Sequence, residues 1–184
     1  MSLDREIFDA AYSLAHRSGL LDGVVIFFAK YLVWLVIPLV VVRILQKKNW
    51  GSEVPAWKNR FQALAIGLVA VIISRGIVSN VLASLIESPR PFVVLDIQPL
   101  FNHAVANSLP SGHMALLIPT VMTLFLLNRK SGWWGIVMAL LVGAARVIAG
   151  VHWPSDILWG ILIGVVSFGA VYALFKRSKF YPLQ

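Results

Sequence analysis

The chain alternates between long apolar runs and short polar segments, a pattern typical of helices that cross a membrane. The apolar runs cover about 22–45, 61–86, 112–127, 133–149 and 154–175. A spanning helix needs about 20 apolar residues, because lipid offers no hydrogen-bond partner to an exposed backbone. The pattern therefore predicts an all-α integral membrane protein, a bundle of about five transmembrane helices in a single domain, 1–184.

The N-terminal segment 4–16 has a different pattern. Apolar residues recur at helical spacing with acids between them, which predicts a short amphipathic helix lying in the membrane interface. Because these acids precede the first apolar run, the order is wrong for a cleaved secretory signal. We expect the segment to remain in the mature protein.

Prolines and glycines mark the helix ends. Gly150 is expected to end the fourth helix, and Pro154 and Pro110 to lie in first helical turns, where the missing proline N–H would be unpaired anyway. The segment 87–111 is too polar and proline-rich to cross the membrane. A loop of that length is usually functional or disordered.

Composition narrows the chemistry. Of the 184 residues, 59% are hydrophobic and 13% charged, and there is no cysteine, which excludes disulfides, thiolate metal sites and a cysteine nucleophile. The net charge of +8 is compatible with nucleic acid, but the basic residues flank apolar runs. We therefore expect a lipid bilayer and no nucleic acid as partner.

The basic residues also predict an orientation. They group beside the first connection, the second connection and the tail: Arg43, Lys47, Lys48, Lys58 and Arg60; Arg129 and Lys130; Lys176, Arg177 and Lys179. With five spans, these groups share one side, which the positive-inside rule makes cytoplasmic, together with the C-terminus. The loop 87–111 and the turn around His152 then face the extracytoplasmic side.

Three short motifs at predicted helix ends carry the candidate chemistry. They are SPRPF with Arg90, LPSGH with Ser111, Gly112 and His113, and RVIAGVHWPSD with Arg146, His152 and Asp156. A helix start has unpaired N–H groups, which we expect at Ser111, Gly112 and His113, and Gly112 lets an anion approach closely. Guanidinium groups match phosphate oxygens in pairs. These motifs predict a phosphate site.

The nucleophile is expected to be His152. Asp156, four residues later, can accept a proton from one imidazole nitrogen and leave the other free to attack. His113 is the candidate general acid, since the ordinary histidine pKa suits proton transfer near neutrality. Two other classes stay open: an intramembrane serine protease using Ser111, and an anion transporter with the arginines as a relay.

The ordered set PRP, PSGH and R-x5-H-x3-D, within about 75–165, resembles the type 2 phosphatidic acid phosphatase (PAP2) superfamily. The resemblance implies dephosphorylation of a membrane lipid phosphate through a phosphohistidine intermediate, without metal or cofactor. It implies His152 as nucleophile, Asp156 as its orienting partner and His113 as general acid. It also implies a phosphate-binding set: Arg90, Ser111, Gly112 and Arg146.

Within this superfamily, ESPRPF with Glu87 and the N-terminal EIFDAAYSLAHRSGLLD resemble bacterial undecaprenyl-diphosphatases, although that branch often has Asp where Gly112 stands. The resemblance implies undecaprenyl diphosphate as substrate, at the outer leaflet of the bacterial plasma membrane. Phosphatidylglycerophosphate and phosphatidic acid remain alternative substrates, and the sequence gives no oligomeric state.

Two family positions lack their usual residues. The lysine seven residues before the arginine of RP is Ala83 here, and the third motif opens with Ala145 in place of serine. Lys30 and Arg75, inside apolar runs, either snorkel, pair with a neighbour or replace that lysine. On a straight helix Arg75 would lie about 12 Å deeper than Ala83, so we expect no direct phosphate contact. His103 is expected to be solvated or interfacial.

Overall fold

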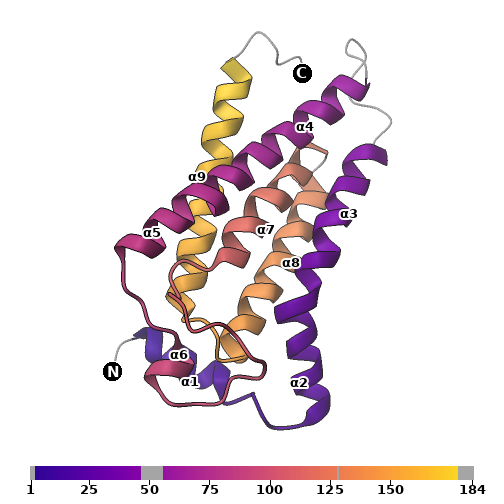
Figure 1. Cartoon of the computed structure of the whole chain (residues 1–184). Helices are drawn as coiled ribbons and strands as arrows, with labels where there is room; N and C mark the ends of the chain where they lie inside the picture. The colour runs from indigo at the N-terminus through magenta and orange to yellow at the C-terminus, as the bar shows by residue number, and fades with distance from the viewer. Residues whose placement is uncertain (1–2, 47–55, 128, 178–184) are drawn as a thin grey trace.

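The computed structural model describes residues 3–46, 56–127 and 129–177 as an elongated helical bundle (Figure 1). Within these residues every regular element is a helix. Four helices are long and apolar enough to cross a membrane: Gly19–Gln46, Trp57–Leu85, Arg129–Ile148 and Pro154–Arg177. A shorter apolar helix, Gly112–Leu126, lies between the second and third of these along the chain. The predicted all-α membrane fold is confirmed, with the third predicted span as the short helix.

The first two spans each contain a π-helical segment. The first comprises α2 (Gly19–Ile26), the π-helical η1 (Phe27–Tyr31) and α3 (Leu32–Gln46), and the second comprises α4 (Ala56–Val71), the π-helical η2 (Ile72–Val78) and α5 (Ser79–Leu85). Lys30 lies in η1 and Arg75 in η2. Pro38 lies inside α3 without ending it. π-helical turns often occur at functional sites.

The short helix is the centre of the bundle. It comprises α7 (Gly112–Met122) and the 3-10 turn η3 (Thr123–Leu126), and α7 packs against α9, α8 and α4. Fifteen residues rise only about 22 Å, less than the roughly 30 Å of hydrocarbon. Figure 1 shows why this suffices: neighbouring helices surround α7, and it begins well inside the bundle relative to the lower end of α8. The start of α7 is therefore recessed.

Two predicted helix boundaries are confirmed and one is wrong. α8 (Arg129–Ile148) is followed by Gly150 at φ 79°, a left-handed conformation that favours glycine, and α9 (Pro154–Arg177) begins with its proline. α7 begins at Gly112, so Pro110 lies before the first turn. The reason is that the backbone is extended at Ser111, which takes the N-cap position although its hydroxyl makes no capping hydrogen bond.

The predicted N-terminal helix is α1 (Leu3–Tyr12), and one of its faces is docked onto the bundle. Phe8 is fully buried, with its ring 5.0 Å from that of Trp153. The Asp4 carboxylate accepts hydrogen bonds from the Ser155 N–H at 2.8 Å and the Ser155 hydroxyl at 2.9 Å. α1 therefore caps the start of α9, while its placement in a membrane interface stays a prediction.

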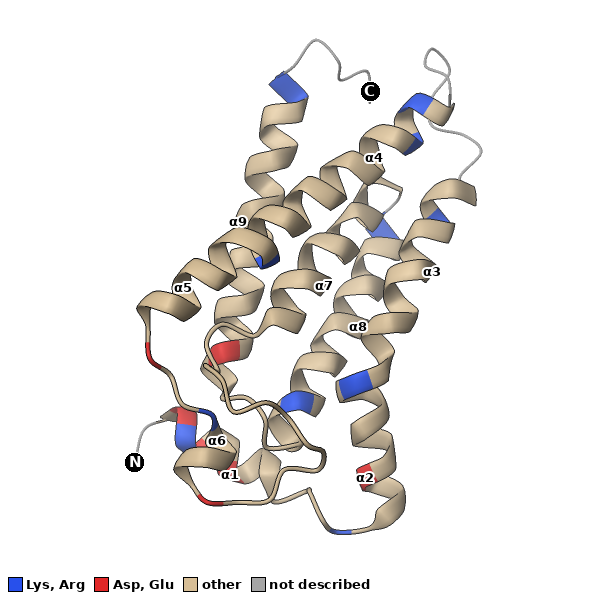
Figure 2. Ribbon diagram, viewed as in Figure 1, with Lys and Arg blue, Asp and Glu red and all other residues tan. Residues whose placement is uncertain are grey.

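Acidic residues gather toward one end of the bundle, whereas basic residues occur toward both ends (Figure 2). The acidic residues lie toward the end that holds α1, the start of α2 and the segment 86–111, which contains the one-turn helix α6 (Pro91–Val94). The opposite end carries basic residues: Arg43, Lys58, Arg60, Arg129, Lys130, Lys176 and Arg177. Lys47, Lys48 and Lys179 lie outside the described residues. The predicted grouping of basic residues at one end is thus present in the fold.

Candidate active site

The three sequence motifs meet in a pocket of about 250 Å³ at the recessed start of α7. Five of the predicted residues line it: Arg90, Gly112, His113, Arg146 and His152. Its other lining residues include four with polar side chains that had no assigned role: Arg75, Asn80, His103 and Asn107. Segments far apart in the sequence thus form a single polar cavity inside an apolar bundle.

His152 and Asp156 form the predicted pair. The distance from Nδ1 of His152 to Oδ2 of Asp156 is 3.2 Å, and both side chains are buried. The same carboxylate oxygen accepts the Trp153 N–H at 2.8 Å. Because Asp156 lies in the first turn of α9, the helix start fixes the carboxylate behind the imidazole.

Ser108 contacts both members of this pair, and the sequence motifs did not predict a role for it. Its hydroxyl donates a short hydrogen bond to Oδ2 of Asp156 and lies 3.3 Å from Nδ1 of His152. The residue is fully buried. No spacing rule links Ser108 to a histidine 44 residues later, so only its position beside the PSGH motif hinted at a role.

The second imidazole nitrogen of His152, Nε2, faces the arginines. Nη1 of Arg90 lies 3.4 Å from it. Burial, and then the positive charges of Arg146 and Arg90, hold the pKa of His152 well below its usual range. The imidazole is therefore neutral near pH 7, with its proton on Nδ1 toward Asp156 and a lone pair on Nε2. That is the protonation state a nucleophile requires.

Arg90 is held almost entirely by backbone carbonyls. It donates to Val151 at 2.8 Å, to Ala106 at 3.1 Å and to Asn107 at 3.2 Å. Only 6% of the residue is exposed. Burial lowers the pKa of Arg90, while the Asp156 carboxylate opposes this shift. The guanidinium is thus fixed in position before any ligand arrives.

Arg146, 1% exposed, is anchored from another span. Its Nη1 donates to the carbonyl of Ala29, within the π-helical η1, at 3.0 Å. Among the described residues, neither Arg146 nor Arg90 forms an ion pair with a carboxylate. Burying a charge without a partner is costly, so two such cations beside one cavity indicate an anion-binding site.

Two further histidines complete the pocket. His113, at the start of α7, lies 3.3 Å from Nη1 of Arg146 through its Nε2. His103, expected to be solvated or interfacial, is partly exposed and lines the pocket: its Nε2 is 2.8 Å from Nη2 of Arg146, and its ring lies 6.1 Å from that of His152. Burial, followed by the charges of Arg90 and Arg146, lowers the pKa of His103 to about 4. The segment 86–111 folds over the pocket, which the sequence pattern could not indicate.

The start of α7 differs in part from the prediction. The N–H of Ser111 is not free, since it donates to the Asp156 carbonyl at 3.0 Å. The Ser111 hydroxyl is buried and has no hydrogen-bond partner, so its role as a phosphate ligand stays a prediction. Gly112 and His113, in the first turn, have N–H groups with no preceding helical carbonyl to pair with.

The two cations within spans, Lys30 and Arg75, differ in their position relative to the pocket. Lys30 is exposed and lies 5.4 Å from the ring of Tyr31, away from the pocket. Arg75 lines the pocket, so the expectation that it lies too deep is wrong. That expectation assumed a straight helix and a site at its end, whereas η2 is π-helical and the start of α7 is recessed. Glu87 is exposed and does not line the pocket.

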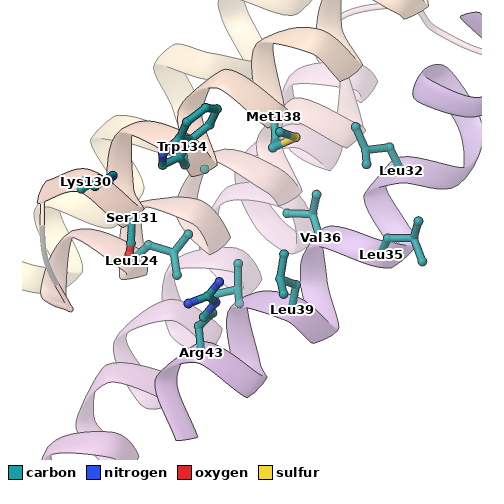
Figure 3. A pocket seen from close by; sticks show the side chains of 12 residues that line it. Leu32, Leu35, Val36, Leu39, Arg43, Leu124, Lys130, Ser131, Trp134 and Met138 are labelled. Carbon is teal, nitrogen blue, oxygen red and sulfur yellow. The ribbon is translucent and has the colours of Figure 1, made fainter. Parts of the chain in front are cut away.

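A larger cavity of about 540 Å³ lies between α3 and α8 (Figure 3). Its walls are mainly apolar, with Arg43 and Lys130 among the lining side chains, and it contains no histidine or carboxylate. The groups suited to catalysis therefore lie in the smaller pocket. Among the described residues, no cluster of three or more His, Asp or Glu is arranged to hold a metal ion, and metal-free chemistry stays a prediction.

A recessed histidine–carboxylate pair facing two buried arginines, in a helical membrane bundle, defines a class of membrane phosphatase. Residues 64–180 match the model of the PAP2 superfamily, and the chain belongs to that family. It is a PAP2-type membrane lipid phosphatase. The family and enzyme class predicted from the three motifs are confirmed.

Known proteins similar to the chain agree with this class. It is 30% identical over 178 residues to the bacitracin transport permease protein BcrC of Bacillus licheniformis, covering 96% of this chain and 82% of the relative. It is 29% identical over 165 residues to the undecaprenyl-diphosphatase BcrC of Bacillus subtilis (strain 168), covering 89% and 80%. The crystal structure of Aquifex aeolicus LpxE matches with a TM-score of 0.73 at 23% identity, covering 94% and 96%, and supports the fold.

The serine protease alternative gains no support from the site, because the Ser111 hydroxyl forms no hydrogen bond with a histidine. The anion-transporter alternative leaves the oriented His152–Asp156 pair without a purpose. The roles of the individual residues in phosphate transfer remain predictions.

Proposed function

We propose that the protein hydrolyses undecaprenyl diphosphate to undecaprenyl phosphate at the outer leaflet of the bacterial plasma membrane. The observation that carries this proposal is the geometry of His152, which lies 3.2 Å from Asp156 through Nδ1 and faces two buried arginines that have no carboxylate partner among the described residues. The choice of lipid is supported by the 29% identity to the Bacillus subtilis undecaprenyl-diphosphatase.

In the first step, Nε2 of His152 attacks the terminal phosphorus. A P–N bond forms, and the bond from phosphorus to the bridging oxygen breaks. The electron pair of that bond leaves with the lipid phosphate, and His113, which must enter this step as the imidazolium, gives one proton to the leaving oxygen and becomes neutral. As the imidazole becomes positive, the Asp156 carboxylate, 3.2 Å from Nδ1, stabilises it.

In the second step, water attacks the phosphohistidine. His113 accepts the proton of the water, the P–N bond breaks, and its electron pair returns to Nε2 of His152. Inorganic phosphate is released and both histidines regain their starting states. His113 thus serves first as acid and then as base, as microscopic reversibility requires.

Charge stabilisation supplies much of the rate. Hydrolysis of phosphate esters is among the slowest uncatalysed reactions, and fixed donors in a buried site stabilise developing charge most effectively. Arg90 and Arg146 are held by backbone carbonyls and need little reorganisation when phosphate binds. The N–H groups at the start of α7 add donors on another side of the phosphoryl group.

The charge distribution supports the orientation. The basic end of the bundle (Figure 2) would face the cytoplasm under the positive-inside rule, and the pocket would face the opposite side. A substrate head group at the outer leaflet would then reach the recessed pocket through the end covered by the segment 86–111. The proposal also places the C-terminus in the cytoplasm.

A substrate panel tests the function. Purified protein in one detergent is given undecaprenyl diphosphate, phosphatidylglycerophosphate and phosphatidic acid, and phosphate release is measured, with His152→Ala as the inactive control. We expect the highest kcat/KM for the diphosphate. A higher kcat/KM for either glycerolipid would assign the protein to the alternative substrate class, and full activity of His152→Ala would remove the proposed nucleophile.

A further inference from the structure

We propose that Arg75 binds the phosphate that stays with the lipid and thereby makes the site selective for diphosphates over monophosphates. This inference rests on the proposed function, and it assigns a role that the three sequence motifs do not include. It begins from the way Arg75 enters the pocket, which depends on the π-helical segment η2.

η2 is fixed directly against the first turn of α7. The Ser74 hydroxyl donates to the Ala115 carbonyl at 2.7 Å, and the Ser79 hydroxyl donates to the Ser74 carbonyl at 2.8 Å. Both serines are buried. Because Arg75 follows Ser74, these bonds hold the arginine at the level where α7 begins.

The Arg75 guanidinium packs on the bare backbone of Gly112. A Cβ atom at this position would lie 2.7 Å from Nε and 3.2 Å from Cζ of Arg75. Glycine is therefore required for close approach of the arginine as it stands. The arginine side chain thus lies beside the first-turn N–H groups of α7, which themselves attract an anion.

Asn80 orients the guanidinium. Nη1 of Arg75 donates to Oδ1 of Asn80 at 3.0 Å, while Nδ2 of Asn80 donates to the Gly76 carbonyl at 2.8 Å. Arg75 forms no ion pair among the described residues. Its remaining N–H donors are thus available to a ligand in the pocket.

The three arginines of the pocket divide into two groups. Arg90 contacts His152 and Arg146 contacts His113, so these two surround the position of the phosphorus that is attacked. Among the described residues, the side-chain hydrogen bond of Arg75 goes to Asn80, and its guanidinium lies beside Gly112, next to the proposed general acid His113. A general acid protonates the leaving oxygen, so a residue beside His113 lies near the leaving group. In a diphosphate that leaving group is itself a phosphate.

Charge balance favours the same substrate class. Three guanidinium groups line the pocket, and no carboxylate lines it. A terminal phosphate alone leaves part of this charge uncompensated, while a second phosphate supplies further negative oxygens that match a guanidinium fork. A lipid diphosphate therefore suits the pocket better than a lipid monophosphate.

The test compares two substrates with one tail. kcat/KM is measured for farnesyl diphosphate and farnesyl monophosphate with the wild type, Arg75→Ala and Arg75→Lys. We expect Arg75→Ala to lower kcat/KM for the diphosphate about 10- to 100-fold, the effect of one lost charge-assisted hydrogen bond. We expect a loss of less than about threefold for the monophosphate, and an intermediate diphosphate loss for Arg75→Lys, which keeps the charge but not the fork.

Two further variants make the result decisive. Lys30→Ala removes the span cation of the other π-helical segment, which does not line the pocket, and should leave both substrates unchanged. Asn80→Ala removes the hydrogen bond that orients the guanidinium, so it should shift the ratio of kcat/KM for the two substrates in the same direction as Arg75→Ala. This variant keeps the inference testable if Arg75→Ala does not fold.

Equal losses for both substrates in Arg75→Ala would overturn the inference and assign Arg75 to the terminal phosphate. An unchanged ratio in every variant would also overturn it. If the wild type itself hydrolyses no diphosphate, the proposed function fails; if it does so while Arg75→Ala keeps the wild-type ratio, only the role of Arg75 fails.

Discussion

Replacing Ser108 with alanine tests whether the support of Asp156 matters for catalysis. The hydroxyl donates to the same carboxylate oxygen that lies 3.2 Å from Nδ1 of His152, and it does not line the pocket. A hydrogen bond to a charged group contributes about 1.5–3 kcal/mol, and each 1.36 kcal/mol in a barrier changes a rate about tenfold. If the bond acts mainly when His152 becomes positive, Ser108→Ala lowers kcat by about 10- to 100-fold.

The kcat–KM split is the decisive measurement. Steady-state phosphate release should give a reduced kcat with a KM within about threefold of the wild type, since Ser108 does not line the phosphate pocket. Ser84→Ala, which removes an exposed hydroxyl that donates only to its own helix at Val81, is the matched control. Ser108→Thr, which keeps a hydroxyl, should recover part of the rate. A normal kcat for folded Ser108→Ala, or a change confined to KM, would refute the reasoning.

Four further predictions concern the pH profile, the pH dependence of stability, the cap of α9 and metal. Because the pKa of His152 is held well below 6.5, kcat/KM should stay high as pH falls through 6.5 and decline only at lower pH, whereas a midpoint near 6.5 in its pH profile would contradict this protonation state. The pKa of His103 is about 4 in the folded protein against an ordinary 6.5, so between these pH values the unfolded chain binds one proton more than the folded protein. Thermal unfolding in detergent should therefore show a loss of stability as pH falls from 6.5 toward 4. The loss should be smaller in His103→Asn. Asp4→Asn should lower stability by about 0.5–2 kcal/mol by weakening the cap of α9, and an unchanged Tm would count against this contact. Removal of divalent metal by a chelator should leave phosphate release unchanged, and loss of activity that added metal restores would contradict the metal-free mechanism.

Much of the fold was predictable because lipid imposes a simple rule on the sequence. Each spanning helix must satisfy its own backbone, so the apolar runs and their flanking charges nearly coincide with the helices. Gly150 and Pro154 marked boundaries for local steric reasons that need no tertiary information. His152 and Asp156 were predictable as a pair because four residues across the start of a helix bring two side chains together.

The remaining site residues depend on long-range packing. Ser108 reaches Asp156 only because the segment 86–111 folds against the start of α9, and His103 reaches Arg146 because the same segment folds over the pocket. The position of Arg75 in the pocket lining depends on the π-helical segment η2. No propensity scale predicts where such a segment forms. The paired N–H of Ser111 likewise follows from a contact with α9.

The most direct test of the central claim is to locate the phosphate on the enzyme during turnover. Wild-type protein is mixed with undecaprenyl diphosphate labelled in the terminal phosphate, quenched in alkali within one turnover, and mapped by peptide mass spectrometry. The account predicts an alkali-stable, acid-labile phosphate on His152 that forms before inorganic phosphate is released and is absent from His152→Ala. Phosphate on any other residue, or release of labelled phosphate by His152→Ala at the wild-type rate, would contradict it.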